Sequence, residues 1–165
     1  MRILGVDCGS RVTGYGVIDT HGADYGFVDC GTVRTRAADS LATRLHLIHK
    51  GLRAVIENHK PDVAVFESVF HAANAQSALK LGHVRGVSMV TAADADLPVF
   101  EYSALEVKSA VTGYGRAEKS QVQQMVQSLL RLREAPEPYD ASDALAVAIC
   151  HAQSYRFKQV STVHE

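Results

Sequence analysis

The feature that most restricts the fold of this chain is a change in hydrophobic spacing near residue 40. Before it, three apolar segments of strand length, residues 2–7, 15–19 and 24–35, follow one another with loops of only a few residues. Such segments with such short loops predict an antiparallel meander. After it, apolar residues recur at spacings of mostly three and four from Leu41 to Ile56, which predicts an amphipathic helix.

The rest of the chain continues with segments of both kinds. Apolar segments predict two more strands, at residues 62–67 and 97–102. Helical spacing predicts further helices over residues 74–93, 103–111, 117–132 and 140–154. Because helices that connect parallel strands cross over a face of the sheet, this order predicts an α/β protein. We expect a mixed five-stranded sheet with helices on both faces.

Two local signals refine this prediction. Gly31 lies inside the third predicted strand and indicates a bulge or a bend there. Asp39 or Ser40 is placed to cap the first helix, and Pro61 closes that helical segment.

Composition and length fit one globular domain. The chain has 165 residues, of which 47% are hydrophobic and 21% are charged, and this excludes disordered, collagenous and coiled-coil classes. We expect a single domain over residues 1–155 and a polar C-terminal tail over residues 156–165. No apolar run fits a membrane span or a signal segment, and Cys8, Cys30 and Cys150 lack disulfide or zinc spacing. We therefore expect a cytoplasmic protein without a membrane partner.

The net charge of −1 argues against a protein that simply coats DNA, but the charges are unevenly distributed. Residues 68–93 contain no acid and two bases, Lys80 and Arg85. Residues 103–133 contain an excess of bases: Lys108, Arg116, Lys119, Arg131 and Arg133 stand against Glu106 and Glu118. The charged residues of 134–143 are all acids. This segregation predicts a positive surface beside a negative pocket, although solvated helix faces would produce the same pattern.

Four acids stand where their carboxylates could meet. Asp7 and Glu67 end two strands expected at the centre of the sheet, and ligands of α/β sheets gather beyond the carboxyl ends of such strands. Asp140 and Asp143 fall in the first turn of the last helix and share one face. Divalent cations would remove the repulsion between these groups, and oxygen ligands suit Mg²⁺ or Mn²⁺. Two such ions about 4 Å apart are suited to phosphodiester hydrolysis.

Each acid also has an ordinary structural explanation. Asp7 is explained as a turn residue and Glu67 as a charge at a strand end. Asp140 is explained as an N-cap and Asp143 as an acid that the helix dipole favours. Two acids at buried strand ends, combined with two acids in one helical turn, favour a metal site over four unrelated explanations.

Six segments stand out in order along the chain: VDCGSRVTGYG at 6–16, FESVF at 66–70, SALKLG at 77–82, PVFEY at 98–102, AEKSQV at 117–122 and DASDALA at 140–146. Together they resemble the motifs of the RuvC-type Holliday-junction resolvases. The resemblance extends over nearly the whole chain. It departs at Cys8, where the family usually has proline, and at Ser142, where alanine is common, but neither change removes a ligand.

The resemblance implies a ribonuclease-H-like fold and a metal-dependent crossover junction endodeoxyribonuclease of DNA recombination and repair. Such an enzyme is a homodimer that resolves four-way (Holliday) junctions by paired symmetric nicks. The resemblance also implies a junction-binding protein and a branch-migration motor as partners. Its catalytic metal ligands, for two Mg²⁺ or Mn²⁺ ions per active site, would be Asp7, Glu67, Asp140 and Asp143.

The residues expected to contact DNA are Phe70, Lys80, Arg85, Lys108, Arg116 and Lys119. The resemblance implies that Lys108 and Lys119 act near the cut and that Phe70 is an aromatic wedge at the junction. Cations neutralise phosphates, and an apolar aromatic side chain can unstack a base step; a core position is the alternative for Phe70. The Ala-, Gly- and Ser-rich helix at 74–93 is the expected dimer interface, with packing on the sheet as the alternative.

Three other functions share parts of this pattern. Asp7, Gly9 and Gly14 also resemble the first phosphate loop of actin-like ATPases and sugar kinases, but those proteins need a second lobe and a second glycine-rich loop. A related ribonuclease-H-like nuclease that acts on RNA would keep a similar acidic set. A binding protein without catalysis would have lost the acids, which are all present here.

Overall fold

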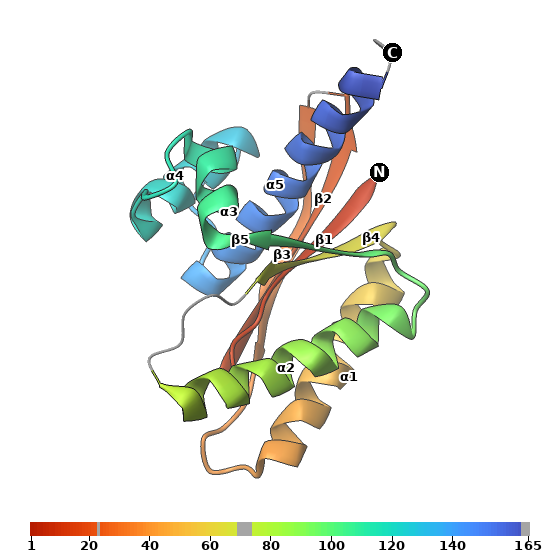
Figure 1. Cartoon of the computed structure of the whole chain (residues 1–165), viewed down its shortest axis with the longest axis vertical. Coiled ribbons are helices and arrows are strands. Elements are labelled where there is room, and N and C mark those ends of the chain that lie inside the picture. The colour runs from red at the N-terminus through yellow and green to blue at the C-terminus, as the bar shows by residue number, and fades with distance from the viewer. Residues whose placement is uncertain (23, 69–73, 163–165) are drawn as a thin grey trace.

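Five strands form one mixed sheet in the order β3-β2-β1-β4-β5 (Figure 1). The computed structural model describes residues 1–22, 24–68 and 74–162, with side chains as far as residue 155. The first three strands pair antiparallel, and β1–β4 and β4–β5 pair parallel. The predicted α/β class and the mixed five-stranded sheet are therefore confirmed.

The elements follow the predicted order with shifted ends. The strands are β1 (Arg2–Asp7), β2 (Val12–His21), β3 (Asp24–Arg34), β4 (Val63–Ser68) and β5 (Val99–Ser103). The helices are α1 (Leu41–His59), α2 (Ala75–Ala93), α3 (Ala104–Thr112), α4 (Lys119–Leu129) and α5 (Tyr139–Thr162). The main difference is α5, which continues to Thr162 and so runs through most of the segment predicted as a polar tail.

Helices cover both faces of the sheet, as predicted (Figure 1). On one face α1 and α2 pack over a core that includes Leu4, Val6 and Phe66. On the other face α3, α4 and α5 pack over a core that includes Ile3 and Val65. Neighbouring residues of β1 and of β4 thus enter opposite cores, which is why these two central strands read as continuously apolar segments.

Of the two local predictions, the structure confirms the helix cap and contradicts the bulge at Gly31. Ser40 caps α1, because its hydroxyl oxygen accepts a hydrogen bond from the Thr43 backbone N–H at 3.2 Å. Gly31 does not mark the bulge: it pairs in register with Tyr15, and the register shifts between Val17 and Ile18 instead. A Cβ on Gly31 would lie only 2.8 Å from the Tyr15 hydroxyl. Glycine there makes room for the neighbouring Tyr15 ring and does not mark a bend.

Three strand glycines bring α5 onto the sheet. Gly5 pairs with Gly16, and Gly14 pairs with Asp7, so the three lie together on β1 and β2. A Cβ on Gly5 would overlap the Ala144 carbonyl, and one on Gly14 would overlap the carbonyl of residue 140. The first turns of α5 therefore rest directly on strand backbone. This contact sets the distance between the acids of α5 and the end of β1.

Within the described residues, every helix falls short of the length and apolarity that a membrane-spanning segment requires.

Candidate active site

The parallel strands β1 and β4 end beside each other, and a hollow of about 220 Å³ opens at this end of the sheet. Carboxylates of Asp7 from β1, Glu67 from β4 and Asp143 from α5 line it. The apolar side of the hollow comes from Ala104, Val107, Val122 and Ala146. The structure thus brings together three of the four predicted acids, from three elements far apart in the sequence.

The electrostatics of the hollow are set by burial and by repulsion among these acids. Burial, together with the nearby carboxylates of Asp143 and Glu67, raises the pKa of Asp7 to about 7. Burial also raises the pKa of Glu67, again with a contribution from Asp143. Three ionised carboxylates are therefore costly in this place unless a cation joins them.

Two lysines from the helices beyond β5 face the acids. Lys119 is the first residue of α4, and its Nζ donates a hydrogen bond to Asp143 Oδ2 at 2.8 Å. This contact raises the pKa of Lys119, because the carboxylate stabilises the ammonium form. Lys108 of α3 lines the same hollow. Both predicted cations near the cut therefore lie at the acids.

The fourth acid, Asp140, stands at the edge of this group. It lies in the first turn of α5 and is half-buried. It does not line the hollow, but its charge contributes to raising the pKa of Asp7. Asp140 is therefore close to the other acids without facing the same space.

The remaining predicted DNA contacts lie on different surfaces. Lys80 on α2 and Arg116 before α4 are exposed. Arg85 of α2 is turned inward: its guanidinium forms an ion pair with Glu101 of β5, and its side chain is only 22% exposed. Phe70 lies outside the described residues.

Two structural roles near the acids were not singled out from the sequence. Glu101 forms an ion pair with Arg85, but the sequence around an acid in a short edge strand gives no indication of such a partner. The close contact at Gly5 and Gly14 was missed as well, although glycine inside a strand is a known sign of close backbone approach.

Cys8 lies beside Ser88 of α2, and burial raises its thiol pKa to about 12, so the thiol is neutral.

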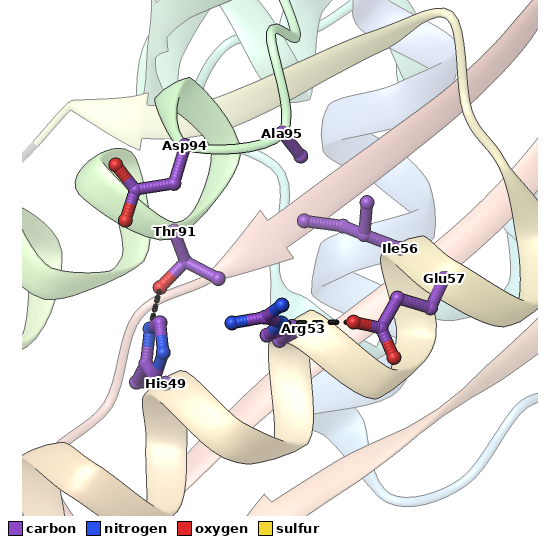
Figure 2. Close-up of a pocket in the computed structure, with 7 residues that line it drawn as sticks. All are labelled: His49, Arg53, Ile56, Glu57, Thr91, Asp94 and Ala95. Carbon is purple, nitrogen blue, oxygen red and sulfur yellow. Dashed lines mark hydrogen bonds and ion pairs between the residues drawn. The ribbon is translucent and has the colours of Figure 1, made fainter.

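A second hollow, of about 250 Å³, lies between α1 and α2 (Figure 2). His49 Nδ1 lies 2.9 Å from the Thr91 hydroxyl, and Arg53 pairs with Glu57 at 2.8 Å. These polar groups bind one another, and none of the four predicted acids lines this hollow. The predicted acids Asp7, Glu67 and Asp143 converge instead on the first hollow, at the end of β1 and β4.

The sequence matches the family described as crossover junction endodeoxyribonuclease RuvC over residues 3–151. This chain belongs to the RuvC family. A curated RuvC of Geobacter sulfurreducens is 55% identical over 160 residues, which cover 97% of each chain. The RuvC of Syntrophotalea carbinolica is 54% identical over 98% of this chain and 100% of the relative.

Solved RuvC structures agree with this membership. Thermus thermophilus RuvC superposes with a TM-score of 0.87 at 32% identity and covers 96% of this chain and 97% of its own. The same enzyme in complex with a Holliday junction substrate gives a TM-score of 0.91 at 33% identity, with 96% of each chain covered. The ribonuclease-H-like fold implied by the resemblance is thereby confirmed for this RuvC-family chain.

Membership of the RuvC family implies dependence on a divalent metal ion, and the residues present fit one. Carboxylate oxygens are the ligands that hard divalent cations prefer, and Asp7, Glu67 and Asp143 share one hollow. Across the described residues, no three Asp, Glu, His or Cys side chains are oriented so that they could hold a metal ion together as they stand. Asp143 instead forms an ion pair with the Lys119 ammonium.

Proposed function

We propose that this chain is a crossover junction endodeoxyribonuclease that resolves four-way DNA junctions by paired symmetric nicks in recombination and repair. One observation carries the proposal. In a RuvC-family chain, carboxylates from β1, β4 and α5 line one hollow that also contains Lys108 and Lys119. Acids suited to divalent cations, beside cations suited to phosphates, are what hydrolysis of a phosphodiester requires.

The catalytic acids of this proposal are Asp7, Glu67, Asp140 and Asp143, which would hold two Mg²⁺ or Mn²⁺ ions. Bound there, the ions would activate the attacking water and stabilise the leaving oxygen. The raised pKa values of Asp7 and Glu67 support this assignment, because buried and mutually repelling carboxylates are costly until a dication joins them. Asp140, set at the edge, would complete the ligand set.

The side chains around the acids would position the DNA. Lys108 and Lys119 would bind the phosphates next to the cut, and exposed Lys80 and Arg116 would bind phosphates farther along the arms. Phe70 as a wedge is a prediction from the resemblance. Arg85 as a phosphate contact also stays a prediction, and its ion pair with Glu101 supports a structural role instead.

A homodimer fits the proposed reaction, because two symmetric nicks need two identical sites. The support is the outer face of α2, where Leu79 and Val90 are 64% and 57% exposed. Gly82 and Gly86 lie between them on the same face, and a Cβ at either position would meet nothing within 4 Å. A second copy packed on this face would bury the exposed apolar surface and approach the glycine backbone closely.

The wider setting follows from the family resemblance. A junction-binding protein and a branch-migration motor would deliver the substrate, and the enzyme would act in the cytoplasm. The three cysteines, Cys8, Cys30 and Cys150, are free thiols, which supports a reducing compartment.

The test is cleavage of a labelled synthetic four-way junction at low salt, with Mg²⁺, Mn²⁺ or EDTA. A linear duplex and an RNA–DNA hybrid of the same sequence serve as substrate controls. We expect paired symmetric nicks in the junction alone, lost in EDTA. Equal cutting of the duplex or the hybrid would favour a related ribonuclease-H-like nuclease.

Asp7→Asn should abolish cleavage and leave junction binding intact, because it removes a metal ligand without changing size. Asp94→Asn is the matched control, since Asp94 lies on the second hollow, away from the acids. Retained cleavage by Asp7→Asn would overturn the proposed metal site.

A further inference from the structure

Lys119 makes a contact in the active site that its proposed role on DNA does not explain. Its ammonium is bound to Asp143 Oδ2 at 2.8 Å, whereas a phosphate contact needs this group free. Asp143 is only 17% exposed and belongs to α5, which rests on the strand glycines. The acid is therefore held in place, and the contact forms because the lysine side chain reaches to it.

The Lys119 side chain is free to leave. It is 68% exposed, and it extends from the first residue of α4, whose backbone is secured by a reciprocal capping box between Glu118 and Gln121. The ammonium can thus swing away by rotation of its own side chain, without movement of α4. A lysine on a fixed helix start, bound to a fixed carboxylate, is an ion pair with one mobile partner.

Lys119 is also placed to act on the whole acidic group. Its charge lowers the pKa of both Asp7 and Glu67, in addition to its direct contact with Asp143. Lys108, which also lines the hollow, lowers the pKa of Glu67. Lys119 is therefore the main cation that partly neutralises the acids. It does so at an oxygen of Asp143, which the proposed function makes a metal ligand.

We propose that the Lys119 ammonium is a resident counter-ion of the acids, which a divalent cation displaces from Asp143 and which then becomes free for a DNA phosphate. This inference rests on the proposed function, because it takes Asp143 as a metal ligand. The metal and the ammonium compete for one carboxylate oxygen and repel each other. Loading of the metal would thereby switch Lys119 from the acid to the substrate.

This proposal makes Lys119 oppose metal binding while it assists DNA cutting. If Lys119 served DNA alone, its removal would leave the metal affinity of the free protein unchanged. Under the proposal, its removal tightens metal binding in the absence of DNA and still slows cleavage. The two effects have opposite signs, which loss of fold or a general defect of the site would not produce.

The experiment is a titration of the DNA-free protein with Mn²⁺, with free Mn²⁺ followed by electron paramagnetic resonance. Lys119→Met removes the ammonium, Lys119→Arg keeps a positive charge, and Lys50→Met removes an exposed charge from α1. We expect Lys119→Met to bind Mn²⁺ about five- to tenfold more tightly than the wild type. Lys119→Arg should stay within about twofold, and Lys50→Met should match the wild type.

Thermal melting with increasing Mn²⁺ supplies a second readout and verifies folding, since a ligand raises the melting temperature according to its affinity. The rise should begin at lower Mn²⁺ in Lys119→Met. If the wild type binds Mn²⁺ and cuts junctions but Lys119→Met binds no more tightly, displacement is overturned and the proposed function stands. If the wild type binds no Mn²⁺, both are overturned.

Discussion

At the scale of single residues, Asp7 shows what the acidic hollow costs the protein. Its carboxyl is buried at the end of β1 near Asp143 and Glu67, and its pKa rises from 3.8 to about 7. The folded state thus binds a proton that the unfolded chain releases at lower pH. Stability is therefore sacrificed at neutral pH for an arrangement that suits a divalent cation.

Asp7 should make the metal-free protein less stable as pH rises. Between about pH 4 and pH 7 the folded state holds more protons than the unfolded state, so the free energy of unfolding falls with pH in that window. Asp7→Asn removes this loss and should be the more stable protein at pH 7, by up to about 4 kcal/mol. Urea denaturation in EDTA at several pH values measures the difference.

Two comparisons sharpen this prediction. Saturating Mn²⁺ should restore wild-type stability at pH 7, because the cation replaces the proton at the acids. Asp94→Asn, outside the hollow, should leave the pH dependence unchanged. Equal stability of the wild type and Asp7→Asn across the whole pH range would show that Asp7 is not under strain.

At the scale of elements, the packing of α5 on the sheet decides whether the acids come together at one site. The acids Asp140 and Asp143 reach Asp7 because the helix backbone lies directly on Gly5 and Gly14. No side chain mediates this contact, and no side chain can adapt to relieve a clash there. The position of two carboxylates therefore depends on the absence of a methyl group.

Gly14→Ala should damage both stability and cleavage. The new Cβ would overlap backbone of residue 140, so α5 must shift, at a cost of about 1–3 kcal/mol or more. Gly26→Ala is the matched control, because its Cβ would lie 3.8 Å from the nearest atom, Asp19 Cβ. Chemical denaturation and junction cleavage measure the two effects; a Gly14→Ala protein with normal cleavage would contradict the role of this contact.

The ion pair between α2 and β5 belongs to the same scale. Arg85 is mostly buried, so Glu101→Gln leaves a charge without its partner and should cost about 1–2 kcal/mol of unfolding free energy. Glu57→Gln breaks an ion pair with Arg53 that is exposed on both sides and should change little. Denaturant titration of both variants makes the comparison.

Junction binding separates the two interpretations of Arg85. If Arg85 only secures α2, Arg85→Met should lower stability and leave the salt dependence of junction binding as it was. If it binds a phosphate, the slope of log affinity against log salt should decrease by about one.

At the scale of the whole molecule, α2 has one face on α1 and the sheet and another that is open. Val84, Ser88 and Ala92 are buried, whereas Leu79 and Val90 are exposed. An exposed apolar stripe on a helix of a folded protomer indicates a partner surface. The dimer expected from the resemblance would use this stripe.

Gly86→Leu should convert a dimer into monomers. The protomer has open space at this position, so its own fold should tolerate the side chain, and helix propensity improves. A second copy packed on α2 would clash with it. Ala42→Leu, at an exposed position of α1, is the control. Sedimentation velocity measures the state; a Gly86→Leu protein that remains dimeric would place the interface elsewhere.

Much of the architecture could be predicted from local chemistry. Apolar runs and helical spacing predicted every strand and helix in order, because both patterns report which side of a local segment meets the core. The acids at the ends of β1 and β4 could be found for the same reason. The extent of α5 could not, because its last turns are polar and the periodicity fades there.

The sequence by itself determined the elements, the sheet class and the family, and it singled out the four candidate acids. Only the tertiary structure decided that Asp7, Glu67 and Asp143 share one hollow while Asp140 stands at its edge. It also decided that Arg85 turns inward to Glu101 and that Lys119 binds Asp143. The reason is physical: periodicity records the environment of neighbouring residues. Contacts between distant residues depend on how closely α5 and α2 approach the sheet, which packing alone sets.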